Sequence, residues 1–315
     1  MRLFIILTLS ILNHGYSQSL KHVGYSDKNF FKSNLELSSL VSVERNFYTA
    51  TERKGMLLQL TLDADCKFKV ANSYPLNIAQ NAEIEGIAYY KGHLLLTDEG
   101  NSSVYDYDIT NKIISTIEDK GFGNILGHNT GDFGMEGITI DEKNDKCFIL
   151  KERTTDFSSL IHMFDISVNP ENKIALKFLK SFKIQHGKLH QNPSKNIRYA
   201  DIYFDSKSDS LYCLKTFYHD EINDNTVRTE EIYRTKLQYR IDVFSLKPYE
   251  NQDGKLTLIT PNNSYDRTKE VDDYRNSYVT NLEGITIYKD TIYLVSDNGR
   301  GQKPTLFLKM SLPKR

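Results

Sequence analysis

Hydrophobic and polar residues alternate over short runs along most of this chain, which is the pattern of half-buried β-strands. In residues 84–100, IEGIAYYKGHLLLTDEG, two such runs flank a Lys-Gly turn, and residues 135–153 and 282–299 follow the same plan. No unit shows the 3.6-residue apolar stripe of a helix, so helical solenoids are excluded. The pattern therefore predicts an all-β protein that is built from repeats.

Each repeat predicts up to four strands. A third strand follows the first two at residues 104–109, 161–166, 241–246 and 306–310, and an outer strand often comes next, as at 112–117 and 255–260. A weaker copy covers residues 35–62, and a divergent copy at 199–215 precedes a polar insertion at about 219–238. The units start near Ser38, Glu85, Glu136, Ala200 and Glu283.

Four-stranded units at this period are typical of a β-propeller, so we predict five antiparallel blades. A propeller with six blades, the sixth inside residues 216–282, is the alternative. The last unit ends after its third strand. Residues 21–25 could supply its outer strand, which would close the ring and remove the exposed sheet edges.

The first residues, MRLFIILTLSILNHGYSQS, are typical of a secretory signal. Arg2 precedes an apolar run that is too short to span a bilayer, and Gly15-Tyr16-Ser17 is a small-x-small cleavage site. We predict a signal peptide at residues 1–18, a single propeller domain at 19–315, and a secreted or periplasmic protein without a transmembrane segment.

Charge and cysteine content narrow the function. The formal net charge of -1 gives no electrostatic footprint for nucleic acid or an anionic membrane. The three cysteines, Cys66, Cys147 and Cys213, are odd in number and lack close spacing, so they do not form a disulfide framework. Cys147 and Cys213 lie in strand-like runs, where we expect buried structural thiols.

The Glu-Gly pairs predict a metal site. The first strand of each blade lines the channel of a propeller, so Glu85, Glu136 and Glu283 would converge on one axis, with Ser38 at the equivalent place. Carboxylates held that close cannot all stay ionised without compensation, and Ca²⁺ takes six to eight oxygen ligands. Zn²⁺ is disfavoured because no His or Cys stands there. Gly after the Glu would let the backbone crowd the axis without a side chain. The alternative is that Glu-Gly only shapes the loop between blades.

A second set of polar residues follows the second strands. The hairpins would bring Asp98, Glu152 and Asp297 to the rim beside the glutamates, where we predict that they orient or activate water. Basic residues on the same rim would hold the oxygens of an anionic substrate such as a phosphoester, and we predict this role for Arg153, Lys215 and Arg300. For each residue the alternative is a solvated rim with salt bridges.

Three segments resemble the phytase-like family, the "esterase-like activity of phytase" domain of secreted, mainly bacterial proteins. They are 281–308 (NLEGIT, LVSDN and QKPTLFL), 133–138 (FGMEGI) and 84–88 (IEGIA). The resemblance covers nearly all of the mature chain. It implies a propeller and the hydrolysis of phosphoesters or other esters.

The order Ser, Glu, Glu, non-acid, Glu at the unit starts is similar to that of the calcium-activated nucleotidases. The similarity implies five blades and a central Ca²⁺. Ala200 departs from a ligand type, although the neighbouring Asp201 could partly replace it.

Several kinds of chemistry have no motif here. The chain lacks the Arg-His-Gly of histidine acid phosphatases, the Gly-x-Ser-x-Gly elbow, a P-loop and a dinucleotide fingerprint. His186 and His190 have no third metal ligand nearby, and we expect a surface loop there. We expect a calcium-dependent phosphoester hydrolase with a small anionic substrate. The alternatives are a non-catalytic propeller that binds a ligand or protein and keeps a structural cation, and a metal-dependent carboxylester hydrolase or lactonase.

Overall fold

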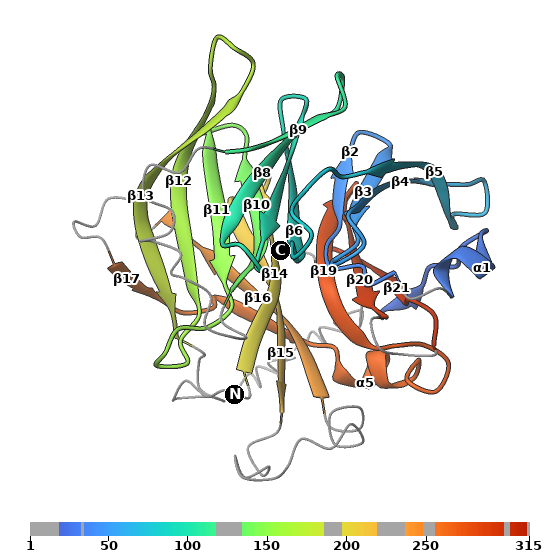
Figure 1. The fold of residues 1–315 in the computed structure, drawn as a ribbon. Helices are drawn as coiled ribbons and strands as arrows, with labels where there is room; N and C mark the ends of the chain where they lie inside the picture. The colour runs from blue at the N-terminus through green and yellow to red at the C-terminus, as the bar shows by residue number, and fades with distance from the viewer. Residues whose placement is uncertain are drawn as a thin grey trace, which may run out of the picture.

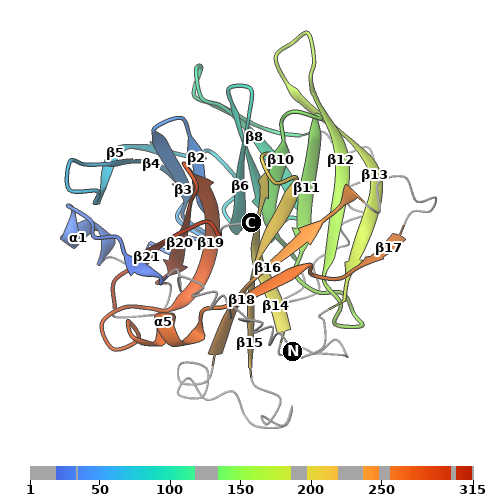
Figure 2. The same cartoon turned by 180° about the vertical axis from the view of Figure 1, so that it is seen from behind.

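The computed structural model describes residues 19–32, 35–117, 134–185, 197–218, 237–247, 256–298 and 303–313. Within these ranges the strands form five sheets that stand side by side around a centre, a five-bladed β-propeller (Figures 1 and 2). The predicted fold class is confirmed. The six-bladed alternative is wrong, because the strands described between residues 216 and 282 join blades 3, 4 and 5. The predicted signal peptide lies outside the described residues.

Strand order along the chain defines the blades. Blade 1 contains β2 (Val41–Val43), β3 (Asn46–Ala50), β4 (Met56–Leu62) and β5 (Phe68–Pro75). Blade 2 contains β6 (Ile84–Tyr90), β7 (His93–Asp98), β8 (Ser103–Asp108) and β9 (Ile113–Thr116). Blade 3 contains β10 (Met135–Asp141), β11 (Lys146–Lys151), β12 (Leu160–Val168), β13 (Ile174–Ile184) and β17 (Leu256–Ile259).

The last two blades use both ends of the chain. Blade 4 contains β14 (Ile197–Asp205), β15 (Ser210–Tyr218), β16 (Leu237–Ser245) and β18 (Asn263–Asp266). Blade 5 contains β19 (Asn281–Tyr288), β20 (Thr291–Asp297), β21 (Phe307–Ser311) and β1 (Lys21–His22). The short helices α1 (Lys28–Phe31) and α5 (Thr268–Asp272) lie outside the sheets. Among the described residues no helix has the length and apolar character needed to cross a membrane.

The N-terminal strand closes the ring as predicted. In β1, Lys21 pairs with Lys309 and His22 with Leu308, so this strand is the outer strand of blade 5. A little further along, Tyr25 forms a parallel bridge with Phe68 at the start of β5. The N-terminal segment therefore joins the last blade to the first.

One outer strand was predicted wrongly. Residues 255–260 do not complete blade 4; β17 instead runs parallel to β13 as a fifth strand of blade 3. The outer strand of blade 4 is β18, which pairs with β16. The alternation in β17 predicts a strand with one buried side, but it does not specify the sheet edge that the strand joins. Ile259 decides the edge, because it is buried with Phe182 of β13.

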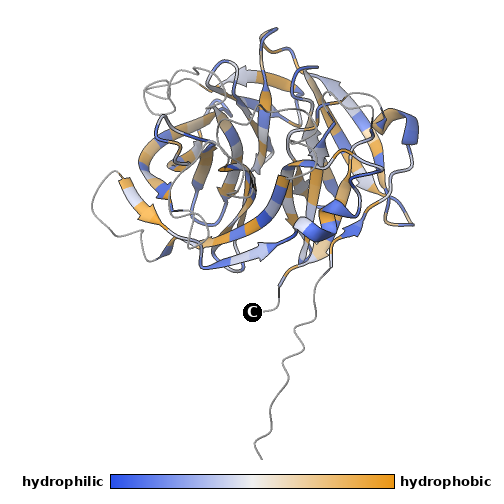
Figure 3. Cartoon of the chain, turned by 90° about the horizontal axis from the view of Figure 1, so that it is seen from below, coloured by the Kyte–Doolittle hydropathy of each residue, from blue (hydrophilic) through white to orange (hydrophobic). Residues whose placement is uncertain are grey.

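The hydrophobic core lies between the blades, and each of five apolar clusters draws its residues mainly from two neighbouring blades. Figure 3 shows that hydrophobic residues are frequent along the strands. Between blades 1 and 5, for example, the ring centroids of Phe47 and Tyr293 lie 5.1 Å apart in an edge-on contact. Burying one such side chain contributes roughly 1.5–3 kcal/mol. Cys147 and Cys213 are buried in two of these clusters, as predicted, while Cys66 is exposed. This packing holds the inner strands at a fixed distance from the axis.

Candidate active site

Each Glu-Gly pair lies at a β-bulge of an inner strand. In β6 the register with β7 shifts at Glu85, which is an extra residue between two paired neighbours. The register shifts in the same way at Glu283 in β19, at Ala200 in β14 and beside Glu136 in β10. A bulge redirects the side chain of the extra residue. The repeated motif is therefore a repeated bulge that aims a glutamate at the axis.

The glycine after the bulge allows the inner strands to touch. A Cβ at Gly86 would lie 2.5 Å from the carbonyl oxygen of Glu136, in the next blade. A Cβ at Gly137 would lie 2.7 Å from the backbone nitrogen of Ile202, one blade further. Any side chain at these places would push neighbouring blades apart. The expectation that this glycine lets the backbone crowd the axis is confirmed.

A second row of acids follows the second strands. Glu99 comes directly after β7 and Glu152 directly after β11, while Glu52 follows β3 by two residues. The electrostatic environment of Glu85 links the two rows, because the carboxylates of Glu136, Glu52 and Glu99 all raise its pKa. We call this set of side chains the acidic mouth: Glu52, Glu85, Glu99, Glu136, Glu152 and Glu283.

Burial and mutual repulsion raise the pKa values of five acids of the mouth: Glu52, Glu85, Glu99, Glu136 and Glu152. Burial is the main cause for Glu85 and Glu136, whose carboxyl pKa values stand well above the usual range. Burial also raises the pKa of Glu52 to about 8 and that of Glu99 to about 7. Carboxyls with such values exchange protons near neutral pH, which is the property of a general acid or base.

Arg198 provides positive charge inside this cluster. Its guanidinium contacts the carboxylate of Glu283, and its Nη1 lies 3.6 Å from Oε1 of Glu152. Its Nε donates a hydrogen bond of 3.1 Å to Oγ1 of Thr216. The sequence analysis missed Arg198. The sequence feature that could have identified it is a basic residue two positions before Ala200, at the start of the fourth unit, which has no glutamate at its bulge.

Glu283 is the most constrained acid of the mouth. It is 6% exposed, and its Oε1 accepts from Arg198 and from Nδ2 of Asn281. Its Oε2 is buried and has no hydrogen-bond partner in the described part of the chain. A buried polar atom without a partner costs about 1–3 kcal/mol. This oxygen is therefore open to a ligand or a cation.

Glu152 and Arg153 form a local pair. Arg153 donates to Oε2 of Glu152 from Nε at 3.1 Å and from Nη2 at 3.0 Å, and both residues are buried. The structure therefore places these two predicted residues together at the mouth. Asp297 lies close enough to Glu52 for its carboxylate to raise the pKa of that residue.

Other predicted residues serve the framework. The hydroxyl of Ser38 donates to the carbonyl oxygen of Ile84, which joins blade 1 to blade 2. Both carboxylate oxygens of Asp201 accept backbone N–H groups at 2.8 Å, one from Ile202 and one from Ile285. The suggestion that Asp201 replaces a missing ligand is therefore disfavoured, because its oxygens join blades 4 and 5.

The structure does not bring Asp98 to the other acids. Its Oδ1 accepts from the backbone nitrogens of Glu83 and Asn101, at 3.0 and 3.2 Å. Its Oδ2 accepts from Nδ2 of Asn101 at 2.7 Å and from the hydroxyl of Tyr105 at 3.0 Å. Side chains alternate along a strand, so a choice that is one residue off selects the opposite face. Glu99, the next residue, is the one that lies at the mouth.

Lys215 is buried inside blade 4. It is 2% exposed, its Nζ lies 3.7 Å from Oδ2 of Asp242, and it lies over the rings of Tyr199 and Phe217. This setting suits a structural ion pair better than the predicted contact with substrate. The predicted Arg300 and the histidine pair at 186 and 190 lie outside the described residues.

The acidic mouth offers the donor atoms that a hard cation prefers, but its side chains are not placed to hold one. Carboxylate oxygens are the ligands that Ca²⁺ prefers, and Oε2 of Glu283 is available. However, the described residues contain no group of three Asp, Glu, His or Cys side chains placed to hold a metal ion. Arg198 supplies a positive charge between Glu152 and Glu283 instead. The calcium site remains a prediction from the sequence.

Comparisons with known proteins agree with the fold. The family model for phytase-like proteins, described as "esterase-like activity of phytase", matches residues 29–299. A search of curated protein sequences gives no significant match. Among solved structures, a glycosyl hydrolase from Bacteroides ovatus is similar with a TM-score of 0.52 and 14% identity, over 90% of this chain and 86% of that one. Glutaminyl cyclase from Myxococcus xanthus is similar with a TM-score of 0.51 and 12% identity, over 94% of this chain and 95% of that one.

Proposed function

Because this chain belongs to the phytase-like family, we propose that it is a hydrolase of ester bonds whose active site is the acidic mouth. The observation that carries the proposal is the position of Arg198, a cation that contacts Glu152 and Glu283 among carboxyls of raised pKa. This combination offers proton transfer and anion binding in one place. Phosphoesters are the proposed substrates. Export through a signal peptide at residues 1–18 belongs to the same proposal.

Two kinds of step can be assigned to the protein's own residues. Glu99, with a pKa of about 7, is protonated in part of the molecules at neutral pH and can give a proton to the leaving oxygen. Its ionised form can take a proton from the attacking water. Arg198 is suited to holding phosphoryl oxygens, because its planar guanidinium matches them in a bidentate way.

Charge balance explains why a cation belongs in the proposal. The carboxyl groups of the acidic mouth outnumber the guanidinium groups that contact them in the described chain, so those that are ionised would repel a phosphoester. A Ca²⁺ ion held by Glu85, Glu136 and Glu283 with Ser38 would offset that charge. When bound, such an ion polarises the phosphoryl group and lowers the pKa of water. Binding would require these side chains to draw closer together than they stand.

A carboxylester or lactone is the second candidate substrate. An uncharged ester would meet no repulsion at the mouth, and a base of pKa about 7 can activate water for it. Lys215 and Asp98 have no part in either version, because their charged groups are engaged inside the blades.

A hydrolysis panel tests the proposal. Purified protein without residues 1–18 is assayed on p-nitrophenyl phosphate, a set of nucleotides and p-nitrophenyl acetate, with either Ca²⁺ or EDTA. Glu136→Gln is the site variant. Glu142→Gln is the matched control, since Glu142 follows the other end of the same strand β10. We expect phosphate release that requires Ca²⁺, falls at least about 100-fold in Glu136→Gln and is unchanged in Glu142→Gln.

The other outcomes are equally informative. Turnover of the acetate ester alone, unaffected by EDTA, would replace the phosphoester with an uncharged ester. If no substrate turns over, but Ca²⁺ raises Tm in the wild type and not in Glu136→Gln, the chain is a binding propeller with a structural cation. An equal loss in both variants would overturn the placement of the active site.

A further inference from the structure

A ring of aliphatic side chains, which we call the aliphatic layer, follows the glutamates along the inner strands. It is formed by the residue that follows each bulge glycine, or by its equivalent, in the five inner strands: Leu40, Ile87, Ile138, Ile202 and Ile285. These side chains are at most 3% exposed. Each of them packs in a different one of the five clusters between blades, and none of the glutamates of the acidic mouth lines the cavity at the other end of the channel. The two ends can therefore bind different molecules.

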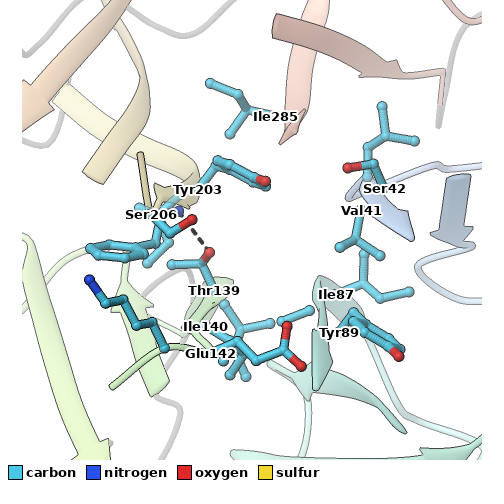
Figure 4. Close-up of a pocket in the computed structure, with 16 residues that line it drawn as sticks. Val41, Ser42, Ile87, Tyr89, Thr139, Ile140, Glu142, Tyr203, Ser206 and Ile285 are labelled. Carbon is cyan, nitrogen blue, oxygen red and sulfur yellow. Dashed lines mark hydrogen bonds between the residues drawn. The ribbon is translucent and has the colours of Figure 1, made fainter. Parts of the chain in front are cut away.

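A cavity of about 440 Å³ lies on the far side of the aliphatic layer (Figure 4). All five inner strands line it. Beyond the layer its walls include Tyr89, Ile140, Tyr203 and Phe204, and Ser42 and Thr139 add hydroxyl groups. We call this cavity the distal chamber. Its volume falls within the range of roughly 300–1,000 Å³ that is usual for small-molecule sites.

Three polar side chains of the chamber wall, those of Ser42, Thr139 and Tyr203, already have protein partners. Ser42 Oγ and the Tyr203 hydroxyl both donate to the carbonyl oxygen of Ile287, at 3.0 and 3.2 Å. Thr139 Oγ1 accepts from the backbone nitrogen of Phe204 at 2.8 Å. The wall therefore offers aliphatic and aromatic surface beside at least as much polar surface. A charged group inside it would lose hydration without gaining a partner.

Charged residues of the lining stand only at the opening. Glu142 and Lys143 belong to the turn after β10, and both are exposed. They carry opposite charges, so the entrance has no net preference for an anion or a cation. Exposed charges of this kind contribute little to binding. The selectivity of the chamber must come from its walls.

The opening is preformed. Tight turns between the first and second strands of the blades surround it, and ion pairs join some of these turns. Lys91 Nζ lies 2.8 Å from Oδ1 of Asp145, and Lys207 Nζ lies 2.8 Å from Oδ1 of Asp290. Each pair connects two neighbouring blades. A ligand would therefore enter a site that needs little rearrangement, which favours binding.

We propose that the distal chamber binds a small, uncharged molecule that carries a ring and a polar substituent. The ring would lie against the aliphatic layer and between the aromatic walls, and a polar substituent would face the opening. This site is independent of the proposed hydrolase activity, because it lies on the opposite side of the aliphatic layer.

Isothermal titration calorimetry with three probes that share one ring system tests this proposal. The probes are 2-naphthol, which is neutral at pH 7, the anion 2-naphthoate and the cation 2-naphthylmethylammonium. We expect 2-naphthol to bind one per chain, and both charged probes to bind at least about tenfold more weakly. Glu283→Gln, on the other side of the layer, should leave the affinity for 2-naphthol unchanged.

Two variants that fill the distal chamber test whether 2-naphthol binds there. Ser42→Trp fills it from strand β2, and Ser206→Trp fills it from an exposed turn that tolerates substitution. The chain contains no Trp, so the emission of the introduced indole reports whether it is buried. Folded variants should lose at least about tenfold in affinity for 2-naphthol. Absence of binding, equal affinity for the charged probes, or unchanged affinity in both folded variants would each overturn the proposal.

Discussion

Arg198 and Glu283 form an ion pair across two neighbouring blades, at the end of the channel where the acidic side chains gather. The bulges of blades 2, 3 and 5 carry a glutamate, whereas the bulge of blade 4 carries Ala200. Blade 4 supplies the arginine two residues before that alanine. The acidic mouth therefore contains its own cation. The positive charge of Arg198 offsets the repulsion between the carboxylates without a bound metal. A metal ion at this place would have to displace the guanidinium, and an anionic substrate would bind beside it.

Removing the guanidinium should destabilise the fold near neutral pH. Breaking a buried ion pair costs about 3–5 kcal/mol, and we expect about 1–3 kcal/mol for Arg198→Met because the arginine side chain is 22% exposed. The loss should shrink toward pH 5, because burial raises the pKa of Glu152, which then takes up a proton. Urea unfolding at pH 7.5 and pH 5 measures both values.

A matched control is available at the same mouth. Arg53 also contacts a glutamate, Glu52, but its side chain is 49% exposed, so Arg53→Met should change stability by less than about 1 kcal/mol. Ca²⁺ should raise the Tm of Arg198→Met more than that of the wild type, because the ion takes over the missing charge. Equal unfolding free energies for Arg198→Met and the wild type at pH 7.5 would contradict the ion-pair account.

The raised carboxyl pKa values predict how stability depends on pH. Burial raises the pKa of Glu99 to about 7 and that of Glu52 to about 8, so the native state binds more protons than the unfolded state above pH 4.5. Stability should therefore fall as pH rises from about 4.5 to 8, by up to about 1.4 kcal/mol per pH unit for each extra proton.

Glu99→Gln isolates this effect. Its amide does not titrate, so the variant should lose less stability than the wild type between pH 5 and pH 8. Glu142→Gln, at the other end of the channel, should follow the wild-type curve. Thermal unfolding at half-unit pH steps makes the comparison. Parallel curves for Glu99→Gln and the wild type would show that Glu99 has an ordinary pKa.

The sequence specifies the blades because a strand's alternation and a turn's composition are local properties. The three Glu-Gly-Ile copies also predicted which residues face the axis, since the inner strand of a propeller always lines the channel. The sheet edge joined by β17 depends on a contact between Ile259 and β13, which no local pattern contains.

The second row of acids shows a different limit of prediction from the sequence. Asp98 and Glu99 are adjacent acids, and a one-residue difference in hairpin register decides which of them reaches the mouth. Arg198 was invisible to the repeat, because the chain places it where the other units have no base. Repeats predict what the blades share, while the chemistry of this mouth depends partly on where one blade differs.

The contact between inner strands predicts a sharp cost for a small substitution. Gly86→Ala would place a methyl group 2.5 Å from the carbonyl oxygen of Glu136, so the two blades must separate. We expect a loss of about 1–3 kcal/mol, measured by urea unfolding. Gly24→Ala is the control, because its methyl group would come no closer than 3.3 Å, to the flexible side chain of Lys67. A loss no larger in Gly86→Ala than in Gly24→Ala would mean that the inner strands adjust freely.

Substitutions of Lys215 test whether this residue has a structural role or a role in substrate binding. Its ammonium pairs with Asp242, which also accepts a hydrogen bond of 2.6 Å from the hydroxyl of Tyr199. Both partners are buried, so Lys215→Met and Asp242→Asn should each cost about 3–5 kcal/mol. The double variant should cost less than the sum of the single variants, because neither charge is then left alone.

Kinetics complete this test on the substrate that the hydrolysis panel identifies. Because Lys215 is held inside blade 4, the folded fraction of Lys215→Met should keep the wild-type KM while its Tm falls. Arg198→Lys serves as the contrast, since it keeps the charge at the mouth but loses the planar fork, and its KM should rise. A raised KM with an unchanged Tm in Lys215→Met would instead support the contact with substrate that its place on the predicted rim first suggested.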